Sequence, residues 1–451
     1  MDDLLDFAIS IGEGIIEARA EDTTTESVIL NNGIMKSVES SVRAGLGVRV
    51  LLHGRTGYSC TTRLNKESVR DAVAHAVRQT FVNASNSILM SVDERAPVIE
   101  RAELQIRELT VDDKIAMVRR AYDSAMEHGE SISSVETGYS RMHGKRYFKS
   151  SDGGDVIWDF ITNSLFAEVT SKGESGLANE YERHGGSFDI SHFSKDNSPE
   201  KIGERAAKHA SEMLRARVCP AGKFRALIDP LLAGTLAHEA FGHMCECDSV
   251  ISGESILAGR IGERLGTDGA TIIDDGSEAV KIPYDDEGSP ARRVTILDHG
   301  VLSSYLHSRR TAHEMGTDTT GNARAASYKY EPICRMRNTY FASGDLPEDE
   351  SLSELRDGIY AIDTIGGQSA SDGTFLFKTA RGYMVKNGEI LYPIKGAAMM
   401  GNILDFFRGV EGATKNIRME PGSCGKSGQF PLPVSTGGPH LLISEAVFGG
   451  E

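Results

Sequence analysis

Hydrophobic residues recur with two different periods near the start of the chain. Between about residues 3 and 19 they return every three to four positions, which predicts an amphipathic helix. Alternating and short continuous apolar runs then predict strands at 27–30, 46–52 and 56–60. The sequence Asn31-Asn32-Gly33 follows the first of these strands and is typical of a tight hairpin turn. A helix followed by antiparallel strands is therefore expected to open the chain.

The helical period returns three times before the middle of the chain and predicts helices at about 66–81, 111–128 and 198–215. Thr110, with Asp113 three residues on, forms a capping pattern for the second helix. Ser198-Pro199 is a typical start for the third. Further strands are expected from about 131 to 170, with a turn at 151–154. The first half thus mixes helices with strands.

The pattern changes after the predicted linker at 219–222. An apolar strand is expected at 224–228, and strand-like, glycine-rich segments follow at 291–306, 373–386 and 389–393. An Asn-Gly hairpin turn at 386–389 is expected to join the last two. We therefore predict an α+β fold, in which an N-terminal mixed α/β domain precedes a β-rich C-terminal domain. The domains are expected at 1–218, with a possible sub-boundary near 95–110, and at 222–451.

Composition and charge narrow the function classes. The 451 residues carry a formal net charge of −16 and no basic stripe, which argues against nonspecific binding to nucleic acid. No apolar run reaches membrane-spanning length, and the acidic start does not resemble an export signal. Six scattered cysteines suggest no disulfide framework. A soluble, cytoplasmic protein is expected.

The segment from Asp229 to His243 carries the most specific chemistry. Asp229 is a good N-cap and Pro230 a good first residue for a helix that contains His238, Glu239 and His243. Zinc hydrolases commonly place two histidines four residues apart on a helix, beside a glutamate base. Here the spacing is five, which would turn the two rings about 140° apart on a regular helix. We therefore predict a π-type turn, for which Gly242 offers backbone freedom.

A catalytic zinc site usually has three protein ligands and one open position. The residues leave several candidates for the third ligand, namely Cys424, Cys245, Glu246, Cys247 and Asp248. Cys424 is preferred because its glycine-flanked loop could approach a helix closely, and because Lys426 or the metal would favour its thiolate. Cys245 and Cys247 follow His243 so directly that the helix would have to deform a second time.

Several motifs in order resemble those of the TldD/PmbA metallopeptidases, in particular the metal-bearing TldD type. The resemblance covers nearly the whole chain and rests on Gly45-Leu46-Gly47-Val48-Arg49-Val50, His238-Glu239-Ala240-Phe241-Gly242-His243, Asp285-Asp286-Glu287-Gly288, Thr320-Gly321-Asn322-Ala323-Arg324, Arg335-Met336-Arg337-Asn338-Thr339-Tyr340, Gly366-Gly367-Gln368 and Cys424-Gly425-Lys426. One departure is Met244, where the family usually has a small residue; it is followed by Cys245 and Cys247, which the motif lacks.

The resemblance implies a zinc peptidase in which His238, His243 and Cys424 bind Zn²⁺ and Glu239 is the base. It also implies degradation of unstructured peptides in a dimer, either with a TldE/PmbA-like subunit that lacks the metal residues or with a second copy. Zinc lowers the pKa of a water molecule from ~15.7 towards about 7, so that Glu239 can take its proton and pass it to the leaving amine.

Two alternatives to a peptidase follow from the same residues. A non-catalytic peptide-binding subunit would be expected to lack the histidines and the glutamate, which this chain has. A zinc-stabilised scaffold would need a closed fourth position, for instance through Cys245 or Cys247. The oxyanion and the substrate backbone need donors, for which the candidates are Asn322, Arg324, Tyr328 and Asn338. The acidic sequence 285–288 lacks the ligand spacing of a calcium loop and is predicted to be a solvated turn.

Overall fold

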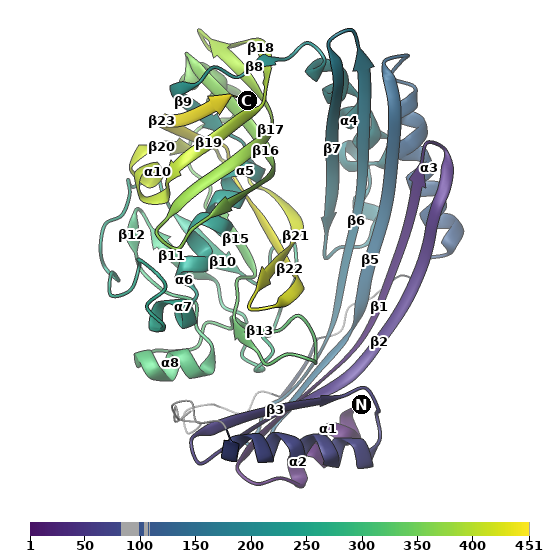
Figure 1. The fold of residues 1–451 in the computed structure, drawn as a ribbon, viewed down its shortest axis with the longest axis vertical. Helices are drawn as coiled ribbons and strands as arrows, with labels where there is room; N and C mark the ends of the chain where they lie inside the picture. The colour runs from purple at the N-terminus through teal and green to yellow at the C-terminus, as the bar shows by residue number, and fades with distance from the viewer. Residues whose placement is uncertain (83–98, 103–106, 108, 451) are drawn as a thin grey trace.

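The computed structural model describes residues 1–82, 99–102, 107 and 109–450. Very long antiparallel strands dominate its first half and form one curved sheet along a side of the molecule (Figure 1). The strand order is β3-β2-β1-β5-β6, and both β7 and β4 pair with β6. The strands of this sheet are β1 (Ile15–Asn31), β2 (Ile34–Leu52), β3 (Arg55–Thr61), β4 (Ile99–Ala102), β5 (Ile132–Ser150), β6 (Asp155–Gly173) and β7 (Gly176–Gly186).

Two pairs of helices pack on this long sheet, one pair at each end (Figure 1). Helices α1 (Asp2–Ser10) and α2 (Lys66–Val82) cover one end, and α3 (Val111–Met126) and α4 (Pro199–Met213) cover the other. Each pair buries small and aliphatic side chains against β1, β2, β5 or β6, so the sheet has two separate apolar cores. The predicted helices 66–81, 111–128 and 198–215 are confirmed to within a few residues.

The first predicted helix was too long. Helix α1 ends at Ser10, and residues from Ile15 onward belong to β1. The break comes from two glycines: Gly14 has a φ of +81°, and a side chain at Gly12 would collide with Ile16. Ile16 and Ala18 are both fully buried in the sheet, and this spacing of two is the period of a strand, so it did not support a helix. The predicted short strands near residues 30 and 50 are parts of β1 and β2, whose polar middle sections gave no apolar signal.

The capping pattern at the start of α3 is confirmed. The Thr110 hydroxyl accepts from the backbone N–H of Asp113, and the Asp113 carboxylate accepts from the backbone N–H of Thr110. The hairpin turn after Asn31 is also present, as is the one at Asn387-Gly388. Both turns place an asparagine and a glycine at positive φ, which explains why these residues signalled turns so clearly.

The second half is built from two sheets around one large core, so the predicted α+β fold is confirmed. The larger sheet has the order β16-β9-β23-β19-β17-β18-β8, and β16 also pairs with β17. Its strands are β8 (Arg217–Val218), β9 (Gly222–Ile228), β16 (Gly358–Ser369), β17 (Thr374–Lys386), β18 (Glu389–Lys395), β19 (Ala397–Asn402), β20 (Val410–Ala413) and β23 (Leu441–Gly450).

The smaller sheet has the order β12-β11-β10-β15-β22-β21. Its strands are β10 (Ile272–Asp275), β11 (Val294–Asp298), β12 (Val301–Leu302), β15 (Asn338–Phe341), β21 (Arg418–Lys426) and β22 (Gln429–Gly438), with a separate pair β13 (Ala323–Arg324) and β14 (Ile333–Cys334). The helices of this half are short, and they are α5 (Pro230–Thr235), the π-helix Leu236–Gly242, α6 (His243–Cys245), α7 (Cys247–Ile251), α8 (Arg309–Met315), α9 (Ser351–Leu355) and α10 (Ile403–Gly409). Among the described residues no helix is long and apolar enough to cross a membrane.

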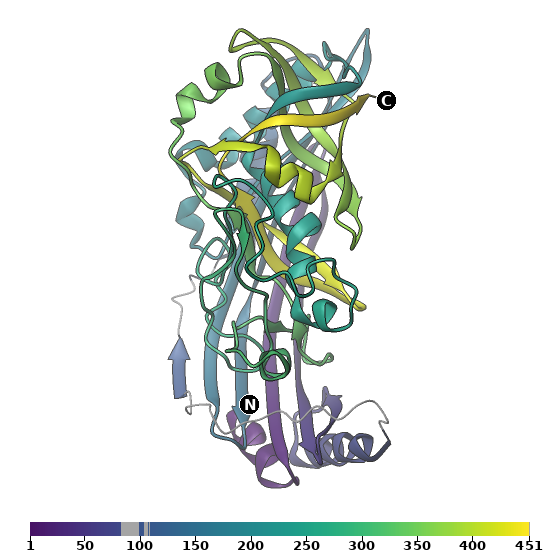
Figure 2. The same cartoon turned by 90° about the vertical axis from the view of Figure 1, so that its left-hand side faces the viewer.

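The turn 285–288 is buried, so its prediction as a solvated turn was wrong. Asp285, Asp286 and Glu287 are each at most 5% exposed. Their partners are arginines from the long sheet: the Asp286 carboxylate lies 3.1 Å from Arg19, and that of Glu287 lies 2.7 Å from Arg49. Because these arginines lie more than 200 residues earlier in the chain, local sequence could not reveal the pairing. Figure 1 shows the long sheet beside the second half, and in Figure 2 the second half lies in front of the long sheet.

A small network of buried charges therefore joins the two halves of the molecule. Arg49 pairs with Glu17 as well as with Glu287, and Arg309 of α8 pairs with Glu17 and with Asp152. Removing one member of such a network leaves a buried charge without compensation, which typically costs about 3–5 kcal/mol.

We expect Arg49→Met to lower the free energy of unfolding by about 3–5 kcal/mol, because Glu17 and Glu287 then lose the buried cation that they share, although Glu17 keeps Arg309. Urea denaturation followed by circular dichroism measures the loss. Lys36→Met is the matched control on the same strand: it breaks an ion pair whose lysine is 60% exposed, so less than about 1 kcal/mol should be lost. Equal losses in both variants would contradict the structural role of the network.

Candidate metal centre

The helix that contains both histidines begins as the sequence predicts. The Asp229 carboxylate accepts from the backbone N–H of Leu232 at 2.9 Å, and Pro230 is the first helical residue. The predicted π turn is confirmed, because residues Leu236–Gly242 form a π-helix in which the backbone N–H of His243 donates to the carbonyl of His238. The extra residue per turn brings the two imidazole centroids to 5.1 Å from each other, with their planes at 82°.

Gly242 has a different role from the one that its type suggested. Its φ of −58° and ψ of −43° are ordinary helical values, so its backbone freedom is not used. A Cβ atom at this position would lie 2.1 Å from the sulfur of Met336, which lies in the connection between β14 and β15. Glycine is therefore required here for close packing of the helix on its neighbour.

The structure brings Cys424 to the two histidines. Cys424 lies on β21, where it pairs with Leu432 of β22, and its Sγ is 3.4 Å from Nε2 of His243. His238, His243 and Cys424 each offer one ligand atom, and these three atoms all lie within 4.8 Å of one another. The other candidates for third ligand are used elsewhere: Cys245 and Cys247 are fully buried in the apolar core of the second half.

The donor set fits a zinc ion. Zinc bonds of ~2.3 Å to sulfur and ~2.0 Å to nitrogen at a tetrahedral angle place the two donor atoms about 3.5 Å apart. The observed Sγ···Nε2 distance of 3.4 Å matches this separation. Two imidazoles and a thiolate are also the ligand types that zinc prefers. Within the described residues, these three are the only cluster of histidine, cysteine or acidic side chains close enough to hold an ion.

Electrostatics favours the thiolate form at Cys424 alone. Burial raises the pKa of this thiol, but hydrogen bonds from His238 and His243 outweigh burial and lower the pKa to about 5. At Cys247 burial raises the pKa to about 12, and at Cys245 burial raises the pKa well above its usual value. The Cys424 thiol therefore ionises readily, as binding to a metal requires, while the thiols of Cys245 and Cys247 stay neutral.

Glu246 orients His243 by binding the side of its imidazole that faces away from Cys424. Its carboxylate is only 1% exposed and lies 2.9 Å from Nδ1 of His243, so Nε2 is the nitrogen that faces the metal centre. Lys426 lies 3.0 Å from the same carboxylate, and the backbone N–H of Met336 donates to it at 3.3 Å. Burial raises the pKa of Glu246, but the charges of His243 and Lys426 outweigh it and lower the pKa to about 2. A carboxylate in this position holds a metal-binding imidazole in one tautomer.

The sequence named Glu246 only as a possible ligand, although its spacing three residues after His243 is compatible with the orienting role. His238 differs from His243, because its Nδ1 is buried and has no hydrogen-bond partner in the described part of the chain. Asp248, the remaining candidate ligand, accepts instead from Nζ of Lys426 at 2.6 Å. Glu246 and Asp248 therefore lie outside the cluster of three ligand atoms and stabilise it from there.

Glu239 is more open to the solvent than either histidine of the site. Its carboxylate is 43% exposed and lies 3.9 Å from Nε2 of His238 and 3.8 Å from Nε2 of His243. Its backbone carbonyl accepts from the Ser369 hydroxyl at 2.7 Å, which fixes the π-helix against the end of β16. The carboxylate can therefore reach a molecule that is bound beside the three ligands.

The four predicted oxyanion or substrate donors are not free for that task. Asn322 donates to Asp274 at 2.9 Å, Arg324 donates to two backbone carbonyls at 2.6 Å, and Asn338 donates to the carbonyls of Asp275 and Val280. Tyr328 packs its ring against Gly45, where any side chain would collide with it. These residues hold the segments of the second half together or join them to β2.

The comparisons with known proteins agree with this architecture. Three models of the PmbA/TldA metallopeptidase family match the chain: the C-terminal domain at residues 221–450, domain 1 at 16–80 and the central domain at 105–214. These matches define a metallopeptidase-type fold, and the chain belongs to the PmbA/TldD family.

Three proteins illustrate the similarity. A protein named metalloprotease from Methanothermobacter thermautotrophicus is 32% identical over 96% of this chain and 95% of its own. A zinc metalloprotease TldD homolog from Saccharolobus solfataricus is 27% identical over 98% of both chains. The crystal structure of TldE from Thermococcus kodakarensis superposes with a TM-score of 0.84 over 100% of both chains at 16% identity, which shows the shared fold.

We expect the metal-free protein to show a thiolate that titrates near pH 5, because the histidines lower the pKa of Cys424. Since the folded pKa is depressed, the thiolate is present above that pH and is lost as the pH falls through it. The ultraviolet absorbance of thiolates measures the transition, and Cys424→Ser should remove it. Persistence of the transition in Cys424→Ser, or its absence in the wild type, would contradict the assignment.

Glu246→Gln should weaken zinc binding by about 10–100-fold, because the imidazole of His243 loses its orienting carboxylate. Competition with a chromophoric zinc chelator measures the affinity. Glu254→Gln, which changes an exposed glutamate outside the cluster, is the matched control and should bind zinc like the wild type. Unchanged affinity in Glu246→Gln would show that His243 needs no second partner.

Proposed function

We propose that this protein is a zinc-dependent peptidase that cleaves unstructured peptides. The single observation that carries the proposal is the half-exposed Glu239 carboxylate beside the cluster of His238, His243 and Cys424. A structural zinc site would instead close the ion with a fourth buried ligand. The cysteines that could supply one, Cys245 and Cys247, are neutral and belong to the apolar core.

A zinc ion held by His238, His243 and Cys424 supplies Lewis acidity, which lowers the pKa of a water molecule and polarises a peptide carbonyl. Glu239 lies where it can accept the proton of the attacking water on a carboxylate oxygen. The same oxygen then delivers that proton to the nitrogen of the leaving amine. Its exposure allows both transfers, because the carboxylate can contact solvent and substrate from the same position.

The strand beside Glu239 offers a place for an extended peptide. Strand β16 pairs with β9 only at residues 359–361, while residues 364–369 pair with β17 alone. The second edge of this section therefore has no strand partner among the described residues. Gly366 and Gly367 lie there, both exposed, and Ser369 ends the section at Glu239. Main-chain hydrogen bonds along a free edge select extended chains of almost any sequence.

We propose that the active form is a dimer with a TldE/PmbA-like subunit or with a second copy of this chain. The full-length similarity to TldE shows that such a subunit would share this fold and could present equivalent surfaces. A reducing compartment, such as the cytoplasm, would keep Cys424 available as a thiolate ligand.

Glu239→Gln should lower the rate of peptide cleavage by at least about 10²–10⁴-fold, because the amide cannot accept the proton of water. Zinc content should stay the same, since Glu239 is not one of the three ligands. Mass spectrometry of an unstructured peptide incubated with the zinc-loaded protein measures cleavage. Glu445→Gln, which changes an exposed glutamate on β23, is the control and should cleave at the wild-type rate. Wild-type cleavage by Glu239→Gln would contradict the role of the base.

A further inference from the structure

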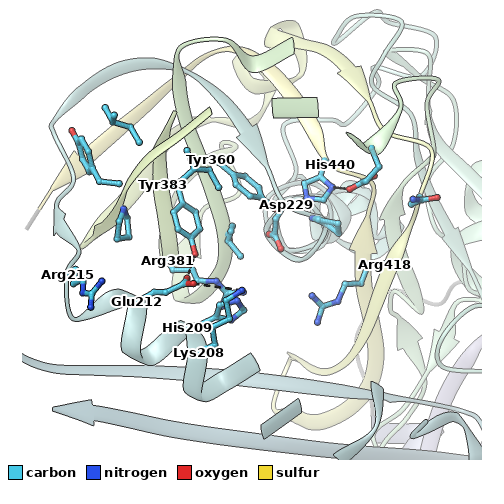
Figure 3. A pocket seen from close by; sticks show the side chains of 18 of the residues that line it. Lys208, His209, Glu212, Arg215, Asp229, Tyr360, Arg381, Tyr383, Arg418 and His440 are labelled. Atoms are coloured by element: carbon cyan, nitrogen blue, oxygen red, sulfur yellow. Dashed lines mark hydrogen bonds and ion pairs between the residues drawn. The ribbon is translucent and has the colours of Figure 1, made fainter. Parts of the chain in front are cut away.

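A cleft of about 770 Å³ lies between helix α4 and one face of strands β16, β17 and β18. Its floor is aromatic and apolar, since Tyr360 of β16 stands opposite Tyr383 of β17, with Ile362 next along the strand. Figure 3 shows the two tyrosines in the middle of the cleft, with the side chains of α4 below them. The volume is in the range that proteins use for small ligands and short peptides.

The acids that line this cleft are already used inside the protein, and so is Arg381. Glu212 accepts from the Tyr383 hydroxyl at 3.0 Å, Glu348 lies 2.5 Å from His440, Asp229 accepts from the backbone N–H groups of Leu232 and Asp363, and Arg381 pairs with Glu180 and Glu182. Arg381 is thus balanced by its own acids, while Glu212 and Asp229 keep their negative charge and use it to accept hydrogen bonds within the protein.

Two cations at the cleft remain available for a ligand. Arg215 is exposed, and its side chain makes no hydrogen bond or ion pair with the described residues. Lys208 is 60% exposed, and its only acidic neighbour in the described structure, Glu212, is 4.0 Å away. The cleft thus favours a ligand that carries a carboxylate.

The mouth of the cleft is apolar. Ile390 and Leu391 at the start of β18 are 48% and 58% exposed, and Ile417 before β21 is 40% exposed. Large aliphatic side chains at the rim of a polar cleft commonly mark a binding surface. Together with the tyrosine floor, they fit a ligand with apolar side chains.

Strand β16 connects this cleft with the metal centre. Tyr360 and Ile362 line the cleft, and Ser369, at the other end of the strand, donates to the backbone carbonyl of Glu239. The seven steps from Ile362 to Ser369 span at most about 23 Å at ~3.3 Å per residue. Strand β16 runs from the cleft to the metal centre. A peptide whose carboxyl end lies in the cleft runs in the opposite direction and is therefore antiparallel to β16. Antiparallel pairing is the commoner and slightly more stable arrangement.

We propose that the cleft binds an apolar, carboxylate-bearing segment of the peptide substrate, about seven residues beyond the bond that is cleaved. This inference rests on the peptidase function proposed above. Lys208 and Arg215 bind the carboxylate, and the tyrosine floor and the aliphatic mouth bind the neighbouring side chains. The carboxylate is either the terminal one of the peptide or that of an Asp or Glu side chain.

Calorimetric titration of the zinc-loaded Glu239→Gln chain tests the cleft itself. The probes are acetyl-Leu-Tyr-Leu-Leu with a free carboxyl terminus, the same peptide as its amide, and acetyl-Leu-Tyr-Leu-Glu amide. The free acid should bind at least tenfold more tightly than its amide, and the third probe shows whether a side-chain carboxylate serves equally. Lys208→Glu with Arg215→Glu should remove the advantage, which a carboxylate bound to the zinc would keep. Lys201→Glu, on the same helix but outside the cleft, is the matched control and should keep it.

Cleavage of a peptide series tests the link to the metal centre. The peptides share one cleavable segment and extend from it by two to ten residues toward an apolar, free carboxyl end. In the zinc-loaded wild type, kcat/KM should rise at least tenfold as this arm passes about seven residues, and Lys208→Glu with Arg215→Glu should remove the rise. A flat length dependence, or equal affinity of the free acid and the amide, overturns the inference. If no peptide of any length is cleaved, the peptidase proposal fails, and the titration still decides whether the cleft binds.

Discussion

The backbone hydrogen bond that His243 donates determines how the two histidines are placed at the candidate metal centre. In a regular α-helix the backbone N–H of His243 would donate to the carbonyl of Glu239, and the two histidines would face away from each other. Here it donates to the carbonyl of His238, five residues earlier, and both imidazoles face the same point. Gly242 leaves room for Met336, which lies just before β15 of the smaller sheet, to pack against the widened turn. A π turn is an energetically poorer form of helix, so its presence at the ligands indicates a local structure retained for function.

The remaining parts of the cluster come from distant segments, and the fold brings them together. The β21–β22 hairpin delivers Cys424, and Lys426 on the same strand binds Glu246 behind His243. Strand β16 ends at the carbonyl of Glu239, and its last residues have no second strand partner within the described part of the chain. The buried ion pairs between the long sheet and the second half, such as Arg49 with Glu287, fix the long sheet next to this half. The proposed chemistry therefore depends mainly on the helix that carries His238, Glu239 and His243, while the position of this helix depends on both halves of the molecule.

The sequence predicted those features that depend on neighbouring residues. The Thr110 cap, the Asn-Gly turns and the π turn all follow from side chains within a few positions of one another. The resemblance to a known family, rather than the spacing, supplied the ligand roles, since Cys424 is 181 residues from His243. The buried state of Asp286 and Glu287 could not be predicted, because their arginine partners are remote in sequence. The full length of these strands was missed because long sections of them, such as the first part of β2 at residues 34–43, are largely exposed and give no apolar run.

X-ray absorption at the zinc edge of the loaded protein tests the central claim most directly. The account predicts one sulfur ligand at ~2.3 Å and two imidazole nitrogens at ~2.0 Å, with a light atom in the remaining position. Loss of the sulfur contribution in Cys424→Ser would assign it to β21. Two or more sulfur ligands would contradict the account, because Cys245 or Cys247 would then close the site, and the exposed carboxylate of Glu239 would have no open position beside it.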